Sequence, residues 1–322
     1  MNPLIIRADA NTQMGTGHVM RCIALAQAWQ DKGGEVCFVS AFELPAIETR
    51  LINEGFNIIF LNVEPGSRSD AEQTAHHSHK LNGEWVVVDG YHFDGDYQKA
   101  IKDAGLKLLS IDDYGHASHY HANIVLNQNI YATEALYTNR ESDTRLLLGS
   151  EYVLLRREFW RWRGWQREIP DVASKILVTL GGSDPNNVTL KIIQALNYIS
   201  TITLDIVVVV GGSNPHQASL QNTANKSRHK IRLVHNVTNM PELMAWADIA
   251  ISAGGSTCWE LAFMGLPNLI VILADNQRFI AEKLSQMGIA VNLGWHTNLS
   301  IKEINRTLEA FVNQVGKRCC LS

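Results

Sequence analysis

Short apolar runs recur along the whole chain, and most are followed by a polar turn and then by apolar residues at helical spacing. This alternation is typical of βαβ units, which place parallel strands in one sheet and helices on its faces. The expected strands cover residues 4–6, 36–40, 57–60, 85–88, 107–111 and 124–126, and then 175–180, 205–210, 231–234, 249–251, 268–271 and 290–293. The sequence therefore predicts an α/β protein with two parallel sheets.

The length of the chain indicates two domains. With 322 residues it exceeds what one hydrophobic core usually holds. A segment around residues 156–172 separates the two groups of strands and contains Pro170, which disfavours helix at the residue before it. We predict an N-terminal Rossmann-like domain at residues 1–155 and a C-terminal one at residues 156–322, with this segment as the linker.

Composition excludes several classes of partner. A formal net charge of −4 at pH 7 gives no basic footprint for nucleic acid. No window approaches the roughly 18 apolar residues of a membrane helix, and the N-terminus reads as a strand rather than as a signal peptide. We expect a cytoplasmic protein that binds neither nucleic acid nor membrane. The cysteines form no Cys-x-x-Cys pair and are expected to be reduced: Cys22, Cys37, Cys258, Cys319 and Cys320.

His18 stands at a helix entrance made of glycines. The apolar run at residues 4–6 leads into a polar loop that ends at Gly17, and apolar residues at helical spacing follow from Val19. Unpaired N–H groups and the positive end of the helix dipole attract anions there and disfavour a protonated imidazole. A neutral His18 beside an anion would suit a general base. A purely structural histidine is the alternative, and it stays open at this point.

A second glycine-rich turn, at residues 254–257, follows the strand predicted at residues 249–251 and begins another helix. Hydroxyls and N–H groups at such a helix start suit a diphosphate. Glu260, one turn later, could accept hydrogen bonds from ribose hydroxyls. The alternative is a capping box, in which Ser256 or Thr257 caps the helix and Glu260 completes the box. Both interpretations could hold together.

A third turn, at residues 181–183, precedes Asp184 and Pro185. We expect Pro185 to begin a helix that Asp184 caps, with the glycines allowing close approach of a phosphate or a sugar. A tight turn without a ligand is the alternative.

Two more polar groups follow predicted strands. Tyr91 is expected to point into a cleft, whereas Asp89 reads as a turn residue. The amide of Asn276 can both donate to and accept from a sugar amide. Because ligands of such sheets bind at the carboxyl ends of the strands, these groups are expected to line one interdomain cleft.

Histidines gather in two places that raise the question of a metal. The first cluster is His76, His77 and His79, and the second is His116, His119 and His121 after Asp112 and Asp113. Neither has the spacing of a His-Glu-x-x-His or Cys/His site. We therefore expect solvated surface and no metal, and the role of residues 112–121 stays open.

Several of these motifs, in the same order, carry a resemblance. The opening motif through His18, the segment 89–91, the turn 181–184 and the segment 275–277 resemble those of the PseG family, the nucleotide-sugar hydrolases of pseudaminic acid biosynthesis. The C-terminal part also looks like the UDP-binding half of the lipid II-forming N-acetylglucosaminyltransferase. The resemblance implies the GT-B fold, in which two Rossmann-like domains face each other across a cleft. It covers residue 4 to about residue 290.

The resemblance implies a metal-independent hydrolase without a cofactor, acting on a UDP-linked 2,4-diacetamido-2,4,6-trideoxyhexose. It maps the water-activating base onto His18, and a single displacement by that water predicts inversion at the anomeric carbon. The predicted substrate-binding residues are Gly17, Arg21, Tyr91, Asn276 and Gln277. The predicted UDP-binding residues are Gly181, Gly182, Ser183, Val237, Gly255, Ser256, Thr257 and Glu260.

Three alternatives share the same motifs. One is a GT-B glycosyltransferase that uses the same donor, and another is a related spore-coat or surface-polysaccharide enzyme with a different nucleotide sugar. The third is a nucleotide-sugar binding protein without catalysis. We expect a monomer in each case.

Overall fold

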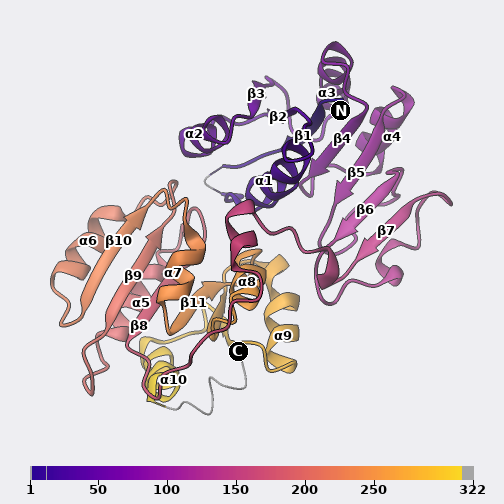
Figure 1. The fold of residues 1–322 in the computed structure, drawn as a ribbon. Helices are drawn as coiled ribbons and strands as arrows, with labels where there is room; N and C mark the ends of the chain where they lie inside the picture. The colour runs from indigo at the N-terminus through magenta and orange to yellow at the C-terminus, as the bar shows by residue number, and fades with distance from the viewer. Residues whose placement is uncertain (1, 12, 314–322) are drawn as a thin grey trace. The chain divides into compact units, whose positions relative to one another are not determined.

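The computed structural model describes residues 2–11 and 13–313. The chain divides between Arg157 and Glu158 into two compact units (Figure 1), and each is described by itself.

The first unit is built on a seven-stranded parallel sheet with the order β3-β2-β1-β4-β5-β6-β7. Its strands are β1 (Leu4–Ala8), β2 (Val36–Ser40), β3 (Asn57–Phe60), β4 (Trp85–Asp89), β5 (Lys107–Ile111), β6 (Ile124–Asn127) and β7 (Arg145–Leu148). Its helices are α1 (Gly17–Gln30), α2 (Pro45–Asn53), α3 (Arg68–Lys80) and α4 (Gly95–Asp103), with short 3-10 helices η1 (Glu134–Tyr137) and η2 (Ser150–Tyr152). The strand order reverses between β1 and β4, which is where ligands of such sheets bind.

The second unit is built on a six-stranded sheet with the order β10-β9-β8-β11-β12-β13. Its strands are β8 (Lys175–Thr179), β9 (Asp205–Val210), β10 (Lys230–His235), β11 (Ile249–Ala253), β12 (Asn268–Ile272) and β13 (Val291–Trp295). Its helices are α5 (Val188–Leu196), α6 (Gln217–Asn225), α7 (Met240–Trp246), α8 (Thr257–Phe263), α9 (Arg278–Gln286) and α10 (Ile301–Asn313), with 3-10 helices η3 (Arg157–Trp162), which spans the boundary, and η4 (Asp275–Gln277).

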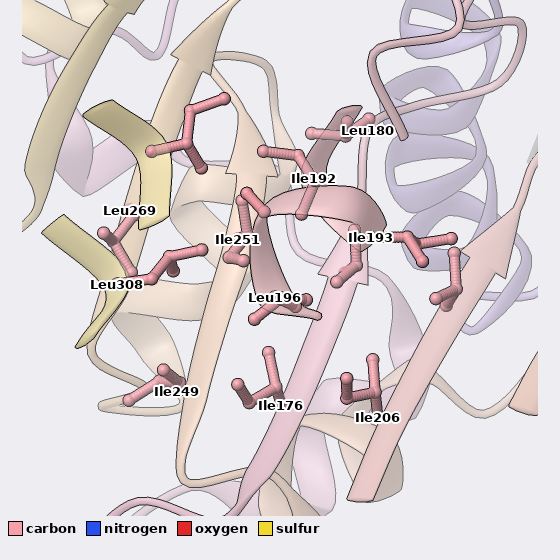
Figure 2. Packing of buried hydrophobic residues seen from close by; sticks show 14 of the residues in the cluster. Ile176, Leu180, Ile192, Ile193, Leu196, Ile206, Ile249, Ile251, Leu269 and Leu308 are labelled. Atoms are coloured by element: carbon pink, nitrogen blue, oxygen red, sulfur yellow. The ribbon is translucent and has the colours of Figure 1, made fainter. Parts of the chain in front are cut away.

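Apolar side chains fill the space between each sheet and its helices. In the second unit Ile176 and Ile251 of the sheet pack in one cluster with Ile192 and Leu196 of α5 and Leu308 of α10 (Figure 2). Because helices cover both faces of a parallel sheet, its strands read as continuous apolar runs rather than as alternating ones.

In the first unit the two faces of the sheet belong to different clusters. Val86 and Val88 of β4 pack on one face, and Val87 packs on the other. The pleat places successive residues on opposite sides in this way. The strand ends, where polar residues begin, are therefore the part of the unit that can carry a site.

The predicted α/β class with two parallel sheets is confirmed, because each predicted apolar run forms a strand whose ends shift by at most two residues. Strand β7 was not predicted. Cys22, Cys37 and Cys258 are buried free thiols, whereas Cys319 and Cys320 lie outside the described residues. Among the described residues, none of the helices is long and apolar enough to cross a membrane.

Candidate active site

His18 lies in the first turn of α1, and its ring meets the carboxylate of Asp89 at the end of β4. The distance from His18 Nδ1 to Asp89 Oδ1 is 2.7 Å, and both side chains are buried. The contact forms because β1 and β4 are neighbours in the sheet, with Ala8 in register with Asp89. An ionised carboxylate only accepts hydrogen bonds, so His18 Nδ1 donates, and in the neutral ring the lone pair would lie on Nε2. This is the arrangement of an oriented general base.

Arg21 lies one turn after His18 on the same face of α1 and holds the same carboxylate. Its Nε and Nη2 atoms donate to the two oxygens of Asp89 at 2.6 and 2.7 Å, and its Nη1 atom donates to Asp113 Oδ1 at 2.7 Å. Such bidentate, charge-assisted pairs fix the geometry of both partners. The sequence predicts a substrate contact for Arg21. In the structure its guanidinium is buried between two carboxylates and orients Asp89, and the substrate contact stays a prediction.

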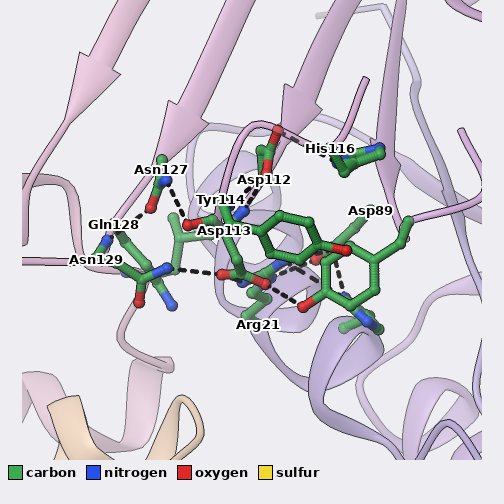
Figure 3. A network of polar contacts seen from close by, with 12 residues as sticks. Arg21, Asp89, Asp112, Asp113, Tyr114, His116, Asn127, Gln128 and Asn129 are labelled. Carbon is green, nitrogen blue, oxygen red and sulfur yellow. Dashed lines mark hydrogen bonds and ion pairs between the residues drawn. The ribbon is translucent and has the colours of Figure 1, made fainter. Parts of the chain in front are cut away.

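Asp113, in the loop after β5, lies between Arg21 and Asn129 (Figure 3), and it joins this network to Tyr91. It accepts a hydrogen bond of 2.7 Å from the Tyr91 hydroxyl and one of 2.8 Å from Asn129 Nδ2. The Tyr91 ring also meets the His18 ring edge to face, with 5.0 Å between the centroids. The structure therefore brings His18, Arg21 and Tyr91 together through Asp89 and Asp113, two carboxylates that the sequence does not single out.

The charges of the network keep both carboxylates ionised. Burial by itself raises the pKa of Asp89, but the positive charge of Arg21 and the contact with His18 outweigh it and lower the pKa below its usual value. Burial also opposes ionisation of Asp113, and Arg21 again outweighs it, so that pKa is low as well. The Cys22 thiol lies 3.4 Å from Asp89 Oδ2, and burial raises its pKa, so it is no nucleophile.

Asp112 shapes the turn that presents Asp113. Its Oδ1 accepts hydrogen bonds from the backbone N–H groups of Asp113, Tyr114 and Gly115, and its Oδ2 accepts one from the Tyr120 hydroxyl. The His116 Nδ1 atom lies 3.3 Å from the same Oδ2. The turn leaves Tyr114 partly exposed, with its ring 5.0 Å from that of Tyr91. Asp112 is thus a structural residue, and the expectation of a solvated His116 is wrong because its side chain is buried against this carboxylate.

The turn at residues 181–183 in the second unit packs directly on another glycine. A Cβ atom on Gly211 would clash with the backbone of Gly182, so the close approach of these two backbones requires glycine at position 211. The prediction that Pro185 begins the next helix is wrong, since α5 begins at Val188. The capping role of Asp184 is confirmed, because its carboxylate accepts the N–H groups of Val188 and Thr189 at 2.8 Å each. The start of α5 therefore already holds an anion.

The start of α8 differs from that of α5. Ser256 precedes the helix but its side chain makes no capping hydrogen bond, so the capping-box interpretation is wrong for Ser256. Gly255 and Thr257 flank it, and Glu260 lies nearly buried in the first turn. A Cβ atom on Gly254 would lie 2.9 Å from the Gln277 carbonyl oxygen, so this turn touches η4.

The remaining predicted residues lie at the same edge of the second sheet. Asn276 is exposed in η4, whereas Gln277 Oε1 accepts a hydrogen bond of 2.9 Å from Leu273 N. Val237 lies in the loop between β10 and α7. All these residues follow the carboxyl ends of parallel strands, as His18 and Tyr91 do in the first unit. The cleft between the two units stays a prediction.

Comparison with known proteins assigns the class of the fold. Residues 176–315 match the family model of the glycosyltransferase family 28 C-terminal domain. The crystal structure of MurG from Acinetobacter baumannii superposes with a TM-score of 0.68 at 16% identity, covering 100% of this chain and 94% of that one. The two parallel-sheet units thus define a protein of the GT-B class.

Three sequence relatives match most of this chain. The UDP-2,4-diacetamido-2,4,6-trideoxy-beta-L-altropyranose hydrolase of Campylobacter jejuni is 28% identical over 89% of this chain and 98% of its own length. The spore coat polysaccharide biosynthesis protein SpsG of Bacillus subtilis is 25% identical over 90% of this chain and 83% of its own. An uncharacterized protein of Methanocaldococcus jannaschii, MJ1062, is 27% identical over 85% of this chain, which spans 56% of that relative. The chain is thus similar over most of its length to the Campylobacter hydrolase and to SpsG.

Proposed function

We propose that the protein is a hydrolase that splits a UDP-linked 2,4-diacetamido-2,4,6-trideoxyhexose into UDP and the free sugar, as a step in pseudaminic acid biosynthesis. The observation that carries the proposal is the buried His18–Asp89 pair, with Nδ1 held by the carboxylate at 2.7 Å. The similarity to the Campylobacter hydrolase over nearly the full length of both chains supports the substrate. In this proposal the enzyme is a cytoplasmic monomer whose chemical step needs no metal.

The oriented histidine would activate water. His18 Nε2 takes a proton from the water as its oxygen bonds to the anomeric carbon, and the bond from that carbon to the phosphate oxygen breaks. The electron pair of that bond leaves with UDP. The positive charge that develops on His18 is balanced by Asp89, which Arg21 holds in place. Tyr91, packed on the His18 ring, borders the position of the sugar.

The UDP would bind in the second unit. We assign its diphosphate to the start of α8, at Gly255, Ser256 and Thr257, because no Ser256 capping bond satisfies that helix start. The turn of Gly181, Gly182 and Ser183 would approach the nucleotide through its backbone only, since Asp184 already occupies the start of α5.

The rest of the substrate would meet four further residues. Glu260 would accept hydrogen bonds from the ribose hydroxyls, and the backbone near Val237 would contact uracil. Asn276 and Gln277, in the 3-10 helix η4, would bind the acetamido groups of the sugar. Gly17, at the start of α1, leaves space for the sugar beside His18, because nothing lies within 4 Å of the Cβ position there.

A second candidate is an enzyme with the same chemistry and a different nucleotide sugar. The similarity to the spore coat protein SpsG, over nearly the same span, favours it. Residues of the sugar site rather than His18 would carry that difference, because the attacking water does not depend on the acyl groups of the sugar.

Purified protein should be incubated with UDP-activated diacetamido sugars and other UDP-sugars, without any acceptor, while UDP and free sugar are measured. The proposal expects UDP and sugar in equal amounts from the diacetamido substrate, released about 10²–10⁴ times more slowly by the His18→Ala variant. Release of UDP only after an acceptor is added would identify a glycosyltransferase. Tight binding of the UDP-sugar without turnover would identify a binding protein.

A further inference from the structure

Two short extended segments of the first unit place four polar side chains on one face. Tyr120 and Arg140 form a parallel β-bridge. The Tyr120 N–H donates to the backbone carbonyl of Asn139, and the Glu141 N–H donates to the backbone carbonyl of Tyr120. In extended chains alternate residues share a face. His119 and His121 therefore lie beside Asn139 and Glu141, whereas Tyr120 points the other way into the core.

The hydrogen bonds of Asn139 fix the tautomer of His119. The Asn139 Nδ2 atom donates to the Ser118 carbonyl oxygen, so Asn139 Oδ1 is an acceptor. This oxygen lies 2.8 Å from His119 Nδ1. His119 Nδ1 must then carry a proton, and in the neutral ring Nε2 keeps a lone pair. That lone pair faces the Glu141 Oε1 atom at 3.0 Å. Two acceptors face each other there, so the contact requires either an extra proton or a cation.

A second imidazole points at the same oxygen. His121 Nδ1 lies 2.8 Å from Glu141 Oε1, and the two histidine rings are 4.3 Å apart between centroids. One ligand atom from each of His119, His121 and Glu141 lies within 4.8 Å of the others. Among residues 2–11 and 13–313, these three form the group of histidine, cysteine and acidic side chains that could hold a metal ion.

We propose that His119, His121 and Glu141 form a surface binding site for a divalent transition metal such as zinc. Two imidazoles and a carboxylate suit Zn²⁺, Ni²⁺ or Co²⁺. Bond lengths of about 2.0–2.2 Å place tetrahedral ligand atoms about 3.3 Å apart, so the contacts at His119 and His121 need to widen by only a few tenths of an ångström. The side chains are 31%, 23% and 47% exposed, which leaves room for water as a further ligand. Asn139 holds His119 from behind, as outer ligands of metal-bound histidines do.

The two histidines of the site lie on the same loop, between β5 and β6, as Asp113 of the candidate active site. His119 and His121 flank Tyr120, whose hydroxyl donates to Asp112, and Asp112 shapes the turn before Asp113. A bound metal would cross-link this loop to the segment at Glu141. It would stabilise the fold, and it takes no part in the proposed chemical step, so hydrolysis should persist in excess chelator.

The test is a titration of untagged, chelator-stripped protein with zinc alone, followed by calorimetry, and with cobalt, followed by its visible spectrum. The unchanged chain is compared with the Glu141→Gln variant, the His121→Ala variant and a control variant. The matched control is His76→Ala with His77→Ala, since these two histidines are neighbours on the surface of α3 with rings 5.6 Å apart. Thermal unfolding of each protein is measured with and without zinc.

The proposal expects one zinc ion per unchanged chain at micromolar affinity and a higher unfolding temperature with zinc. Loss of a residue that only orients a metal ligand lowers metal affinity by roughly 10–100-fold. Glu141→Gln and His121→Ala each remove a ligand itself, so each should lower zinc affinity by more than this factor. The histidine control should bind zinc normally. Equal zinc affinity in the Glu141→Gln variant and the unchanged chain would overturn the proposal, as would absence of micromolar binding. Glu141→Gln keeps the size and shape of an exposed side chain, so this variant is expected to fold. The zinc affinity of Glu141→Gln therefore decides the test even if His121→Ala does not fold.

Discussion

Replacing Asp89 by asparagine is the sharpest perturbation of the candidate active site. The amide keeps the shape of the side chain but loses the charge, and its NH₂ group must face a donor of either His18 or Arg21. Where the NH₂ group faces His18, Nδ1 no longer has an acceptor that fixes its proton, and where it faces Arg21 Nε, the bidentate hold of Arg21 is lost. The imidazolium that forms as water attacks also loses its counter-charge.

The structure sets the size of two separate effects. A positioned general base is worth about 10²–10⁴ in rate, so kcat should fall by up to that factor when His18 loses its orientation. Arg21 also loses a buried bidentate partner, and breaking such a pair costs about 3–5 kcal/mol of unfolding free energy. The two effects must be separated, because a less stable enzyme also shows less activity.

The Asp113→Asn variant separates them. Asp113 is also a buried partner of Arg21, with a contact of 2.7 Å, but the hydrogen bonds of its carboxylate do not include His18. Its replacement should cost similar stability, and it should act mainly on KM because Tyr91 loses its acceptor. Unfolding in urea gives the stability, and UDP release from the diacetamido substrate gives kcat and KM.

The result that refutes the reasoning is a folded Asp89→Asn enzyme whose kcat matches that of Asp113→Asn. Asp89 would then be only a structural partner of Arg21.

Three further expectations follow from individual residues. His18→Ala should lower kcat by about 10²–10⁴ while UDP affinity, measured by competition, stays the same; loss of UDP binding would make His18 a phosphate ligand. Glu260→Ala should weaken UDP by about 1–3 kcal/mol because ribose hydroxyls lose a charged acceptor, and unchanged affinity in calorimetry would leave Glu260 without a ribose contact. The free energy of unfolding should fall in acid, because the folded-state pKa values of Asp89 and Asp113 are lowered. The stability that these two ionised carboxylates contribute is complete above the unfolded-state pKa of about 3.9 and is lost as pH falls through the folded-state values. Urea unfolding at decreasing pH should show a smaller loss for Asp113→Asn, and an equal loss would contradict the assignment.

The sequence predicts the central strands well because they are apolar runs buried on both faces, as in β1, β2, β4, β11 and β12. Strand β7 escaped prediction because its apolar core is the short run Leu146–Leu148, and the segment before it forms η1 and irregular turns instead of a helix. The βαβ rhythm that identifies the other strands is therefore missing there.

The site could be predicted only in part. His18 and Tyr91 stand out because each follows a strand in a recognisable motif. Asp89 does not, since a carboxylate at a strand end looks the same whether it ends a turn or accepts from a histidine 71 residues away. Its role depends on β1 and β4 being neighbours, which is a property of the sheet order. Knowledge of that order would have been enough to pair Asp89 with His18.

The start of α5 shows a second limit. Pro185 is favourable at a first helical position, yet Asp184 adopts a φ of 42° and Asn187 one of 52°, so the chain turns once more before the helix begins at Val188. Left-handed backbone is open to Asp and Asn because their short side chains bond locally. This local preference outweighs that of the proline.

The central claim is that water held by His18 attacks the anomeric carbon rather than phosphorus. Hydrolysis in water enriched with heavy oxygen tests it, with mass spectrometry of both products. The account predicts that the label enters the sugar, that UDP stays unlabelled, and that the sugar is released with inverted anomeric configuration. Label in the UDP would contradict the claim, even if the substrate proves to be the proposed one.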